Sequence, residues 1–145
     1  MTKEDYMRIA LAEATKCDDS KDVPVGVVLV KDGKILAKAY NKKEKHNIAT
    51  YHAEILAIEK ACKKLNNFRL DGVDVFVTKE PCIMCYGALL SARVDNIYFG
   101  AYDSRFGVES IKDVIKFNHT VGMQGGILEK ECSALLHDFF EKIRK

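Results

Sequence analysis

Two short motifs must meet in space if this chain is to bind a metal, and that requirement restricts its fold more than any other feature. The first is His-Ala-Glu at residues 52–54, and the second is Pro-Cys-Ile-Met-Cys at residues 81–85. One imidazole and two thiolates provide three ligands for a tetrahedral zinc, and a free fourth position for water is typical of a catalytic zinc rather than a structural one. Glu54 lies two residues after His52, so its carboxylate can lie beside the metal without binding it. The pattern predicts a hydrolytic site.

The spacing of the two thiols suits metal binding. Cys82 and Cys85 are three residues apart, which places them on one face of a helix. In the first turn, unpaired N–H groups and the helix dipole lower the pKa of a thiol and favour the thiolate. His52 is expected to begin its own helix, so two helix N-termini can converge on one ion. A zinc ion lowers the pKa of bound water towards about 7, and Glu54 would carry the proton of that water to the leaving nitrogen.

Each motif has a simpler explanation when it is taken alone. A histidine at the start of a helix is more often a cap or a surface residue. Pro-Cys-x-x-Cys also occurs as a redox dithiol or as half of a four-cysteine zinc site. The four-cysteine site needs a second close pair, and the remaining cysteines are isolated: Cys17, Cys62 and Cys132. We expect these three to pack as small apolar side chains, and the two motifs together favour the three-ligand metal site.

The overall composition predicts an ordinary soluble domain. The chain has 145 residues, of which 48% are hydrophobic and 30% charged, and we expect one domain over residues 1–145. The longest apolar run, residues 23–30, is too short to cross a bilayer, and the N-terminus has no signal-peptide core. These features predict a cytoplasmic protein without a membrane association. A net charge of +2 does not by itself indicate a nucleic-acid partner.

Apolar periodicity and turn signals predict an alternation of helices and strands. The predicted helices are residues 2–17, 52–65, 81–92 and 128–143. The predicted strands are residues 23–30, 34–40, 73–77, 96–99 and 119–124, with a loop at 41–51. Such an order implies a central sheet with helices on both faces. Pro81 is expected in the first turn of its helix. The last helix is expected to bury a group of apolar side chains: Leu135, Leu136, Phe139 and Ile143.

The chain resembles the zinc-dependent cytidine/nucleotide deaminase superfamily. The superfamily shares the His-x-Glu and Pro-Cys-x-x-Cys signature, and the flanking residues resemble its tRNA adenosine deaminase branch. The matching segments are residues 23–26, 50–55, 80–85, 99–101, 118–119, 126–128, 131–132 and 138–140. The resemblance implies a cytidine deaminase-like α/β fold, which is a three-layer α/β/α sandwich with a five-stranded mixed sheet. It also implies a homodimer.

The activity implied by the resemblance is hydrolytic deamination of adenosine to inosine at the wobble position of a tRNA anticodon. The partner would be the anticodon stem-loop, whose unpaired target base enters the pocket at low cost. By position, His52, Cys82 and Cys85 match the ligands of one Zn²⁺ per chain, and Glu54 matches the catalytic proton shuttle.

Four further residues match substrate contacts of the family. Asn41 matches an asparagine that hydrogen-bonds the purine, and Asp103 matches an acidic residue that contacts the target nucleotide. Arg105 stands where the family usually has lysine, which suggests a phosphate contact, and Arg144 is a candidate phosphate partner at the end of the last helix. From the sequence alone, Asn41 and Asp103 could equally be turn residues.

Two departures from the family pattern leave other functions open. Ile48-Ala49 stand where the family commonly has Asp-Pro, and the loop at residues 105–110 is shorter and carries Glu109 near the expected RNA path. The second hypothesis is therefore a deaminase of a free nucleobase or nucleoside, of the guanine or cytosine type. A third is a zinc-binding or RNA-binding module without activity. The presence of Glu54 and the open metal position disfavour it.

Overall fold

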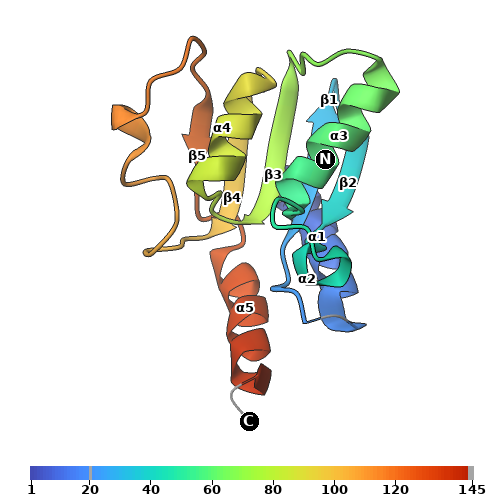
Figure 1. Ribbon diagram of the computed structural model, residues 1–145, viewed down its shortest axis with the longest axis vertical. Helices are drawn as coiled ribbons and strands as arrows, with labels where there is room; N and C mark the ends of the chain where they lie inside the picture. The colour runs from blue at the N-terminus through green and yellow to red at the C-terminus, as the bar shows by residue number, and fades with distance from the viewer. Residues whose placement is uncertain (20, 144–145) are drawn as a thin grey trace.

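The computed structural model describes residues 1–19 and 21–143, and a five-stranded sheet lies at its centre (Figure 1). The strands lie in the order β2-β1-β3-β4-β5. Their bounds are β1 Gly26–Lys31, β2 Lys34–Tyr40, β3 Val73–Lys79, β4 Asn96–Ala101 and β5 Gly122–Gln124. β1 pairs antiparallel with β2 and β3, whereas β4 pairs parallel with β3 and β5. The predicted mixed five-stranded sheet is confirmed.

Helices cover both faces of the sheet. They are α1 Lys3–Ala14, α2 Lys43–His46, α3 Ala53–Leu65, α4 Ile83–Ser91 and α5 Glu129–Ile143, with 3₁₀ turns η1 Thr15–Asp19 and η2 Lys112–Val114. α3 and α4 pack on one face, and α1 and α5 pack on the other (Figure 1). The three-layer α/β/α arrangement is therefore confirmed. No helix among residues 1–19 and 21–143 has the length and apolar character that a membrane span requires.

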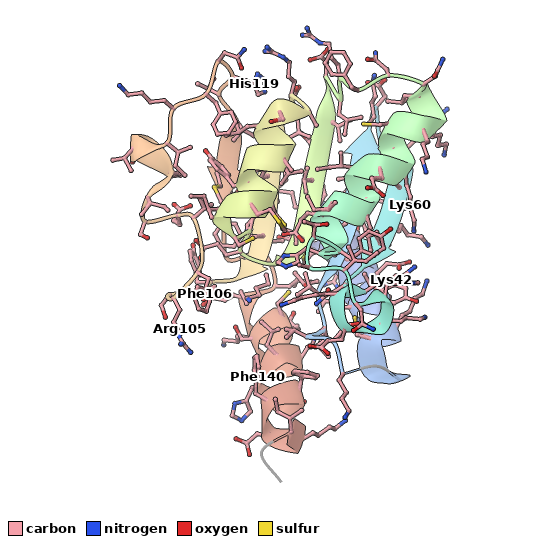
Figure 2. The ribbon with its side chains drawn as sticks, viewed as in Figure 1. Lys42, Lys60, Arg105, Phe106, His119 and Phe140 are labelled. Atoms are coloured by element: carbon pink, nitrogen blue, oxygen red, sulfur yellow. The ribbon has the colours of Figure 1, made fainter. Side chains whose placement is uncertain are left out.

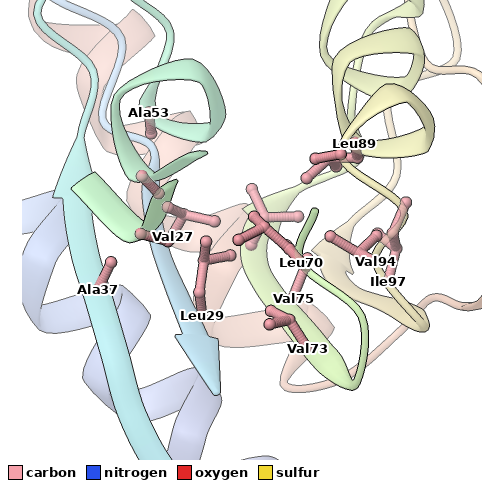
Figure 3. Packing of buried hydrophobic residues seen from close by; sticks show 14 of the residues in the cluster. Val27, Leu29, Ala37, Ala53, Leu70, Val73, Val75, Leu89, Val94 and Ile97 are labelled. Atoms are coloured by element: carbon pink, nitrogen blue, oxygen red, sulfur yellow. The ribbon is translucent and has the colours of Figure 1, made fainter. Parts of the chain in front are cut away.

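The alternation of side chains along β1 explains why two layers of helices are needed. Val27 and Leu29 are fully buried beneath α3 and α4, whereas Val28 and Val30 point to the α1 face. Figure 3 shows the first of these clusters between the strands and the two helices. Burial of one such side chain stabilises the fold by about 1.5–3 kcal/mol. The two faces of one sheet thus hold two separate cores.

The close approach of α1 to β1 depends on Gly26. A Cβ at this position would collide with the backbone of Ala10 and Ala14 in α1. Gly26→Ala is therefore expected to lower the free energy of unfolding by about 1–3 kcal/mol, measured by urea denaturation. Gly87→Ala in α4 is the matched control. Its Cβ would meet Cζ of Phe117 at 3.4 Å, so that change should be neutral or stabilise by up to about 1 kcal/mol. Equal losses in the free energy of unfolding for Gly26→Ala and Gly87→Ala would contradict the special role of Gly26 in the contact between α1 and β1.

Several predicted boundaries were wrong by a few residues. The first helix ends at Ala14 and continues as the 3₁₀ turn η1, and the first strand begins at Gly26 rather than at residue 23. The predicted loop 41–51 contains the short helix α2, and the predicted strand 119–124 is reduced to three residues. Pro81 does not lie in the first turn of its helix. It precedes the N-cap residue Cys82, where its missing N–H also costs no helical hydrogen bond.

The last helix is less buried than its apolar spacing predicted. Cys132 is its only buried residue, and Ile143 is 60% exposed. α5 packs against β4 and β3 through its first half and then extends beyond the sheet (Figure 1). Its last turns therefore have no sheet to pack against. Leu135, Leu136 and Phe139 are partly buried.

Candidate metal centre

The two helix N-termini carry the candidate ligands. His52 is the N-cap of α3 and Cys82 is the N-cap of α4, both with extended backbone conformations. Cys85 lies in the first turn of α4 and is fully buried. α3 and α4 pack side by side on the same face of the sheet (Figure 1). His52 and Cys82, which are 30 positions apart in the sequence, are thus brought together.

The three ligand atoms have the spacing of a metal site. Nδ1 of His52 lies 3.8 Å from Sγ of Cys82 and 3.5 Å from Sγ of Cys85. All three atoms lie within 4.8 Å of one another. Bond lengths of about 2.3 Å to sulfur and about 2.0–2.1 Å to nitrogen around a tetrahedral zinc put neighbouring nitrogen and sulfur about 3.6 Å apart. The donor set and its spacing therefore fit zinc.

The remaining cysteines do not join this cluster. Cys17 and Cys132 are buried in the protein interior, and Cys62 is half-buried in α3. The prediction that the former two pack as small apolar side chains is confirmed. Within the described part of the chain, the group of His52, Cys82 and Cys85 is the only one in which three potential ligands come this close. This arrangement supports a three-ligand site over a four-cysteine one.

The thiol of Cys82 is arranged to carry negative charge. Hydrogen bonding from Cys85, together with His52, lowers the pKa of Cys82 to about 3 despite partial burial. Cys85 behaves in the opposite way. The hydrogen bond from Cys85 to Cys82, together with burial, raises the pKa of Cys85, so Cys85 is the protonated thiol of the pair. The hydrogen bond to Cys82 also raises the pKa of His52. The cluster thus concentrates negative charge on sulfur, which is where a soft divalent cation binds.

Glu54 is a buried carboxyl group in the first turn of α3. The residue is 5% exposed. Burial raises its pKa, with a further contribution from the charge of Cys82, and these effects outweigh hydrogen bonding from its own backbone N–H. A carboxyl group whose pKa lies nearer to neutrality can both accept and return a proton during one reaction. Its position beside the cluster is the one expected from its spacing to His52, and its role in proton transfer stays a prediction.

The predicted substrate residue Asn41 follows β2 and braces the backbone. Its Nδ2 donates a hydrogen bond to the carbonyl of Val23 at 3.1 Å, and its Oδ1 accepts one from the N–H of Lys43 at 3.1 Å. These contacts fit the turn role that the sequence left open. Binding of a purine by Asn41 stays a prediction.

Asp103 and Arg105 lie in the loop that follows β4. Oδ1 of Asp103 accepts hydrogen bonds from the N–H groups of Arg105 and Phe106, and Oδ2 lies 3.0 Å from Nζ of Lys79. Burial acts to raise the pKa of Asp103, but these hydrogen bonds and Lys79 outweigh it and hold the pKa below its usual value. Arg105 is exposed. The predicted contact Arg144 lies outside the described residues.

The sequence did not indicate the roles of two buried carboxylates, Glu80 and Asp22. Glu80 accepts hydrogen bonds from the backbone N–H groups of Asp103 and Glu109, and Asp22 accepts them from the first residues of α2. Glu80 follows β3 directly and immediately precedes the cysteine motif. That position is a signal that could have identified it. Asp22 carries no comparable signal, because its partners lie more than twenty residues away in the sequence.

Comparisons with known proteins identify the relatives of this chain. The family model of the MafB19-like deaminases matches residues 1–144. A tRNA-specific adenosine deaminase of Bacillus subtilis is 41% identical, and the alignment covers 100% of this chain and 93% of the relative. A tRNA-specific adenosine deaminase of Aquifex aeolicus is 43% identical, with 99% and 97% of the two chains covered.

Solved structures agree with the sequence comparisons. A structure from a study of A-to-I editing by tRNA:A34 deaminases at the wobble position superposes with a TM-score of 0.85 at 38% identity, covering 90% of this chain and 98% of that one. A guanine deaminase from Bacillus subtilis superposes with a TM-score of 0.69 at 30% identity, covering 99% and 94%. A guanine deaminase from Nitrosomonas europaea, at 22% identity and a TM-score of 0.81, covers 95% and 84% and shares the fold.

Proposed function

Because this chain belongs to the family of tRNA-specific adenosine deaminases, we propose that it converts adenosine to inosine at the wobble position of a tRNA anticodon. Water is consumed and ammonia is released. The observation that carries the proposal is the convergence of His52, Cys82 and Cys85 beside the buried Glu54, in a chain similar to these deaminases over its whole length. The cytidine deaminase-like fold supplies both helix N-termini that make this convergence possible.

His52, Cys82 and Cys85 would hold one zinc ion per chain. When bound, such an ion acidifies water, so that a nucleophile is available near neutral pH. Glu54 would take the proton of that water and deliver it to the departing amino group of the adenine. Its burial raises its pKa, which makes the carboxyl group suited to both steps. Catalysis by this chain's own residues thus centres on Glu54.

The anticodon loop suits this site because its bases are not held in a duplex, so a base can enter a pocket at a small unstacking cost. Asp103 and Arg105 lie on a loop whose Gly107 pairs with Cys82, and this proximity supports roles for both in substrate binding. We propose substrate-binding roles for Asn41 and Arg144 on the family resemblance. We further propose a homodimer, and a location in the cytoplasm, where a tRNA substrate is available.

The proposed reaction can be tested on defined substrates. The zinc-loaded protein is incubated with an anticodon stem-loop of a tRNA for arginine that carries A at the wobble position, and inosine is measured by mass spectrometry. A stem-loop with G at that position is the matched control, and we expect inosine only from the first. Free guanine and cytosine test the alternative, which the 30% identity to a guanine deaminase motivates. Ammonia release from a free base with both RNAs inert would overturn the proposal.

A further inference from the structure

The loop between β4 and η2 exposes an aromatic side chain next to a residue whose backbone pairs with the candidate ligand Cys82. Phe106 is 65% exposed. The next residue, Gly107, forms an isolated antiparallel bridge with Cys82, and the N–H of Val108 donates to the carbonyl of Pro81 at 3.1 Å. Figure 2 shows Arg105 and Phe106 at the outer edge of this loop. The backbone of the loop is thus paired with the segment that carries one of the ligands.

Buried Glu80 holds this loop in one conformation. Its Oε1 accepts the N–H of Asp103 at 2.9 Å and its Oε2 accepts the N–H of Glu109 at 2.6 Å, so one carboxylate binds both ends of the loop. Gly107 packs directly on that carboxylate, because a Cβ at Gly107 would collide with it. The N–H of Phe106 is fixed in turn by Oδ1 of Asp103 at 3.1 Å. The position of Phe106 is therefore set by hydrogen bonds at both of its flanks.

We propose that Phe106 is a substrate-binding residue that stacks on a base of the RNA next to the target nucleotide, and that Glu80 is the positioning residue that holds its loop. The inference rests on the proposed function. Unpaired bases of an RNA loop are recognised by stacking on aromatic side chains and arginine planes. The guanidinium of Arg105 lies over the Phe106 ring, 5.2 Å from its centre. One exposed unit therefore offers an apolar ring for a base and a positive charge for a phosphate.

Exposure alone does not distinguish Phe106, because Phe68 is 72% exposed as well. The difference lies in position. Phe68 follows the C-terminus of α3, whereas His52 and Glu54 lie at its N-terminus, roughly 18 Å away along thirteen residues. Phe68 is therefore a matched control, being an exposed phenylalanine on the same protein that is remote from the metal centre.

The stacking role is tested with Phe106→Ala, Phe68→Ala and Phe106→Trp, each loaded with zinc and assayed on the A34 stem-loop. Loss of one stacked base is expected to raise KM and to weaken stem-loop binding by about 5- to 100-fold. The change in kcat should be smaller, and zinc content should not change. Phe68→Ala should have the KM and the stem-loop affinity of the wild type. Phe106→Trp keeps an aromatic ring at this position and should therefore bind the stem-loop about as tightly as the wild type. Equal affinities for wild type and Phe106→Ala, or equal losses in Phe106→Ala and Phe68→Ala, would overturn the inference.

The positioning role is tested with Glu80→Gln, whose amide can accept from only one of the two N–H groups without presenting a donor to the other. We expect faster hydrogen exchange at the amides of Asp103 and Glu109, and a higher KM at unchanged zinc content. Glu13→Gln is the control, since Glu13 is also a buried carboxylate but pairs with Lys16 and Lys38 far from this loop. In combination with Phe106→Ala, the loss of binding should be less than additive.

Two results would remove the role of Glu80, namely unchanged amide exchange, or faster exchange with unaltered stem-loop binding. Stem-loop affinity can be measured without turnover, so the stacking role of Phe106 and the proposed reaction are tested separately. Absence of inosine with the wild-type protein would refute the proposed reaction. Stem-loop affinities of the wild type and of Phe106→Ala, measured by fluorescence anisotropy, would still decide on the stacking role.

Discussion

Glu54→Ala is expected to lower kcat for deamination by at least about 10²–10⁴-fold, the usual contribution of a general acid–base residue. The variant removes the only group that we assign to proton transfer, so both the deprotonation of water and the protonation of the leaving amino group lose their catalyst. None of the three ligands changes. The zinc content should therefore stay at the wild-type value, and substrate binding should change much less than kcat.

The measurement combines steady-state kinetics on the stem-loop with metal analysis of the same preparation. Glu59→Ala is a matched control, because Glu59 lies on the same helix but is exposed to solvent. That control should retain wild-type kinetics. Full activity of the Glu54 variant at normal zinc content would show that another group moves the proton. Loss of zinc in this variant would instead mean that Glu54 supports the ligand geometry.

His52→Ala should abolish both zinc retention and activity. Replacement of groups that only orient a ligand typically costs about 10–100-fold in metal affinity or activity, and removal of a ligand itself should cost more. Two adjacent sulfurs remain in the variant, and they are too few for a stable tetrahedral site. After dialysis, the zinc content of the variant should be far below one ion per chain.

This variant also separates the metal site from a redox dithiol. If Cys82 and Cys85 formed a redox pair, its chemistry would survive the loss of the imidazole. His137→Ala is the control, since His137 is exposed on α5 and lies outside the ligand cluster. Retained deaminase activity in His52→Ala, with the control unaffected, would refute the three-ligand site.

The clustering of His52, Cys82 and Cys85 follows a pattern that the sequence shows. Each motif occupies the start of a helix, and the spacing of Cys82 and Cys85 alone places both thiols on one side of it. The sheet and the helix layers on its two faces could also be predicted, because the pattern of apolar residues along a strand indicates which of its faces are buried. Val27 and Val28, buried in different cores, illustrate this point.

Features that depend on distant segments could not be predicted in the same way. The spacing of Ile143 shows that one face of α5 is apolar, but it does not show that the sheet ends before the helix does. The role of Glu80 depends on backbone N–H groups 23 and 29 residues away. No side-chain pattern marks those groups. For Asn41, the sequence left two roles open, and the structure adds its hydrogen bonds to Val23 and Lys43.

The placement of His52 and Cys82 at the caps of separate helices would link the supply of the proposed zinc ion to folding. These two residues are 30 positions apart in the sequence, and α3 and β3 lie between them in the chain. An unfolded chain therefore offers no preformed site, and the free energy of metal binding becomes part of the free energy of folding. By mass action, a scarcity of zinc would lower the thermal stability and the steady-state abundance of this enzyme as well as its turnover.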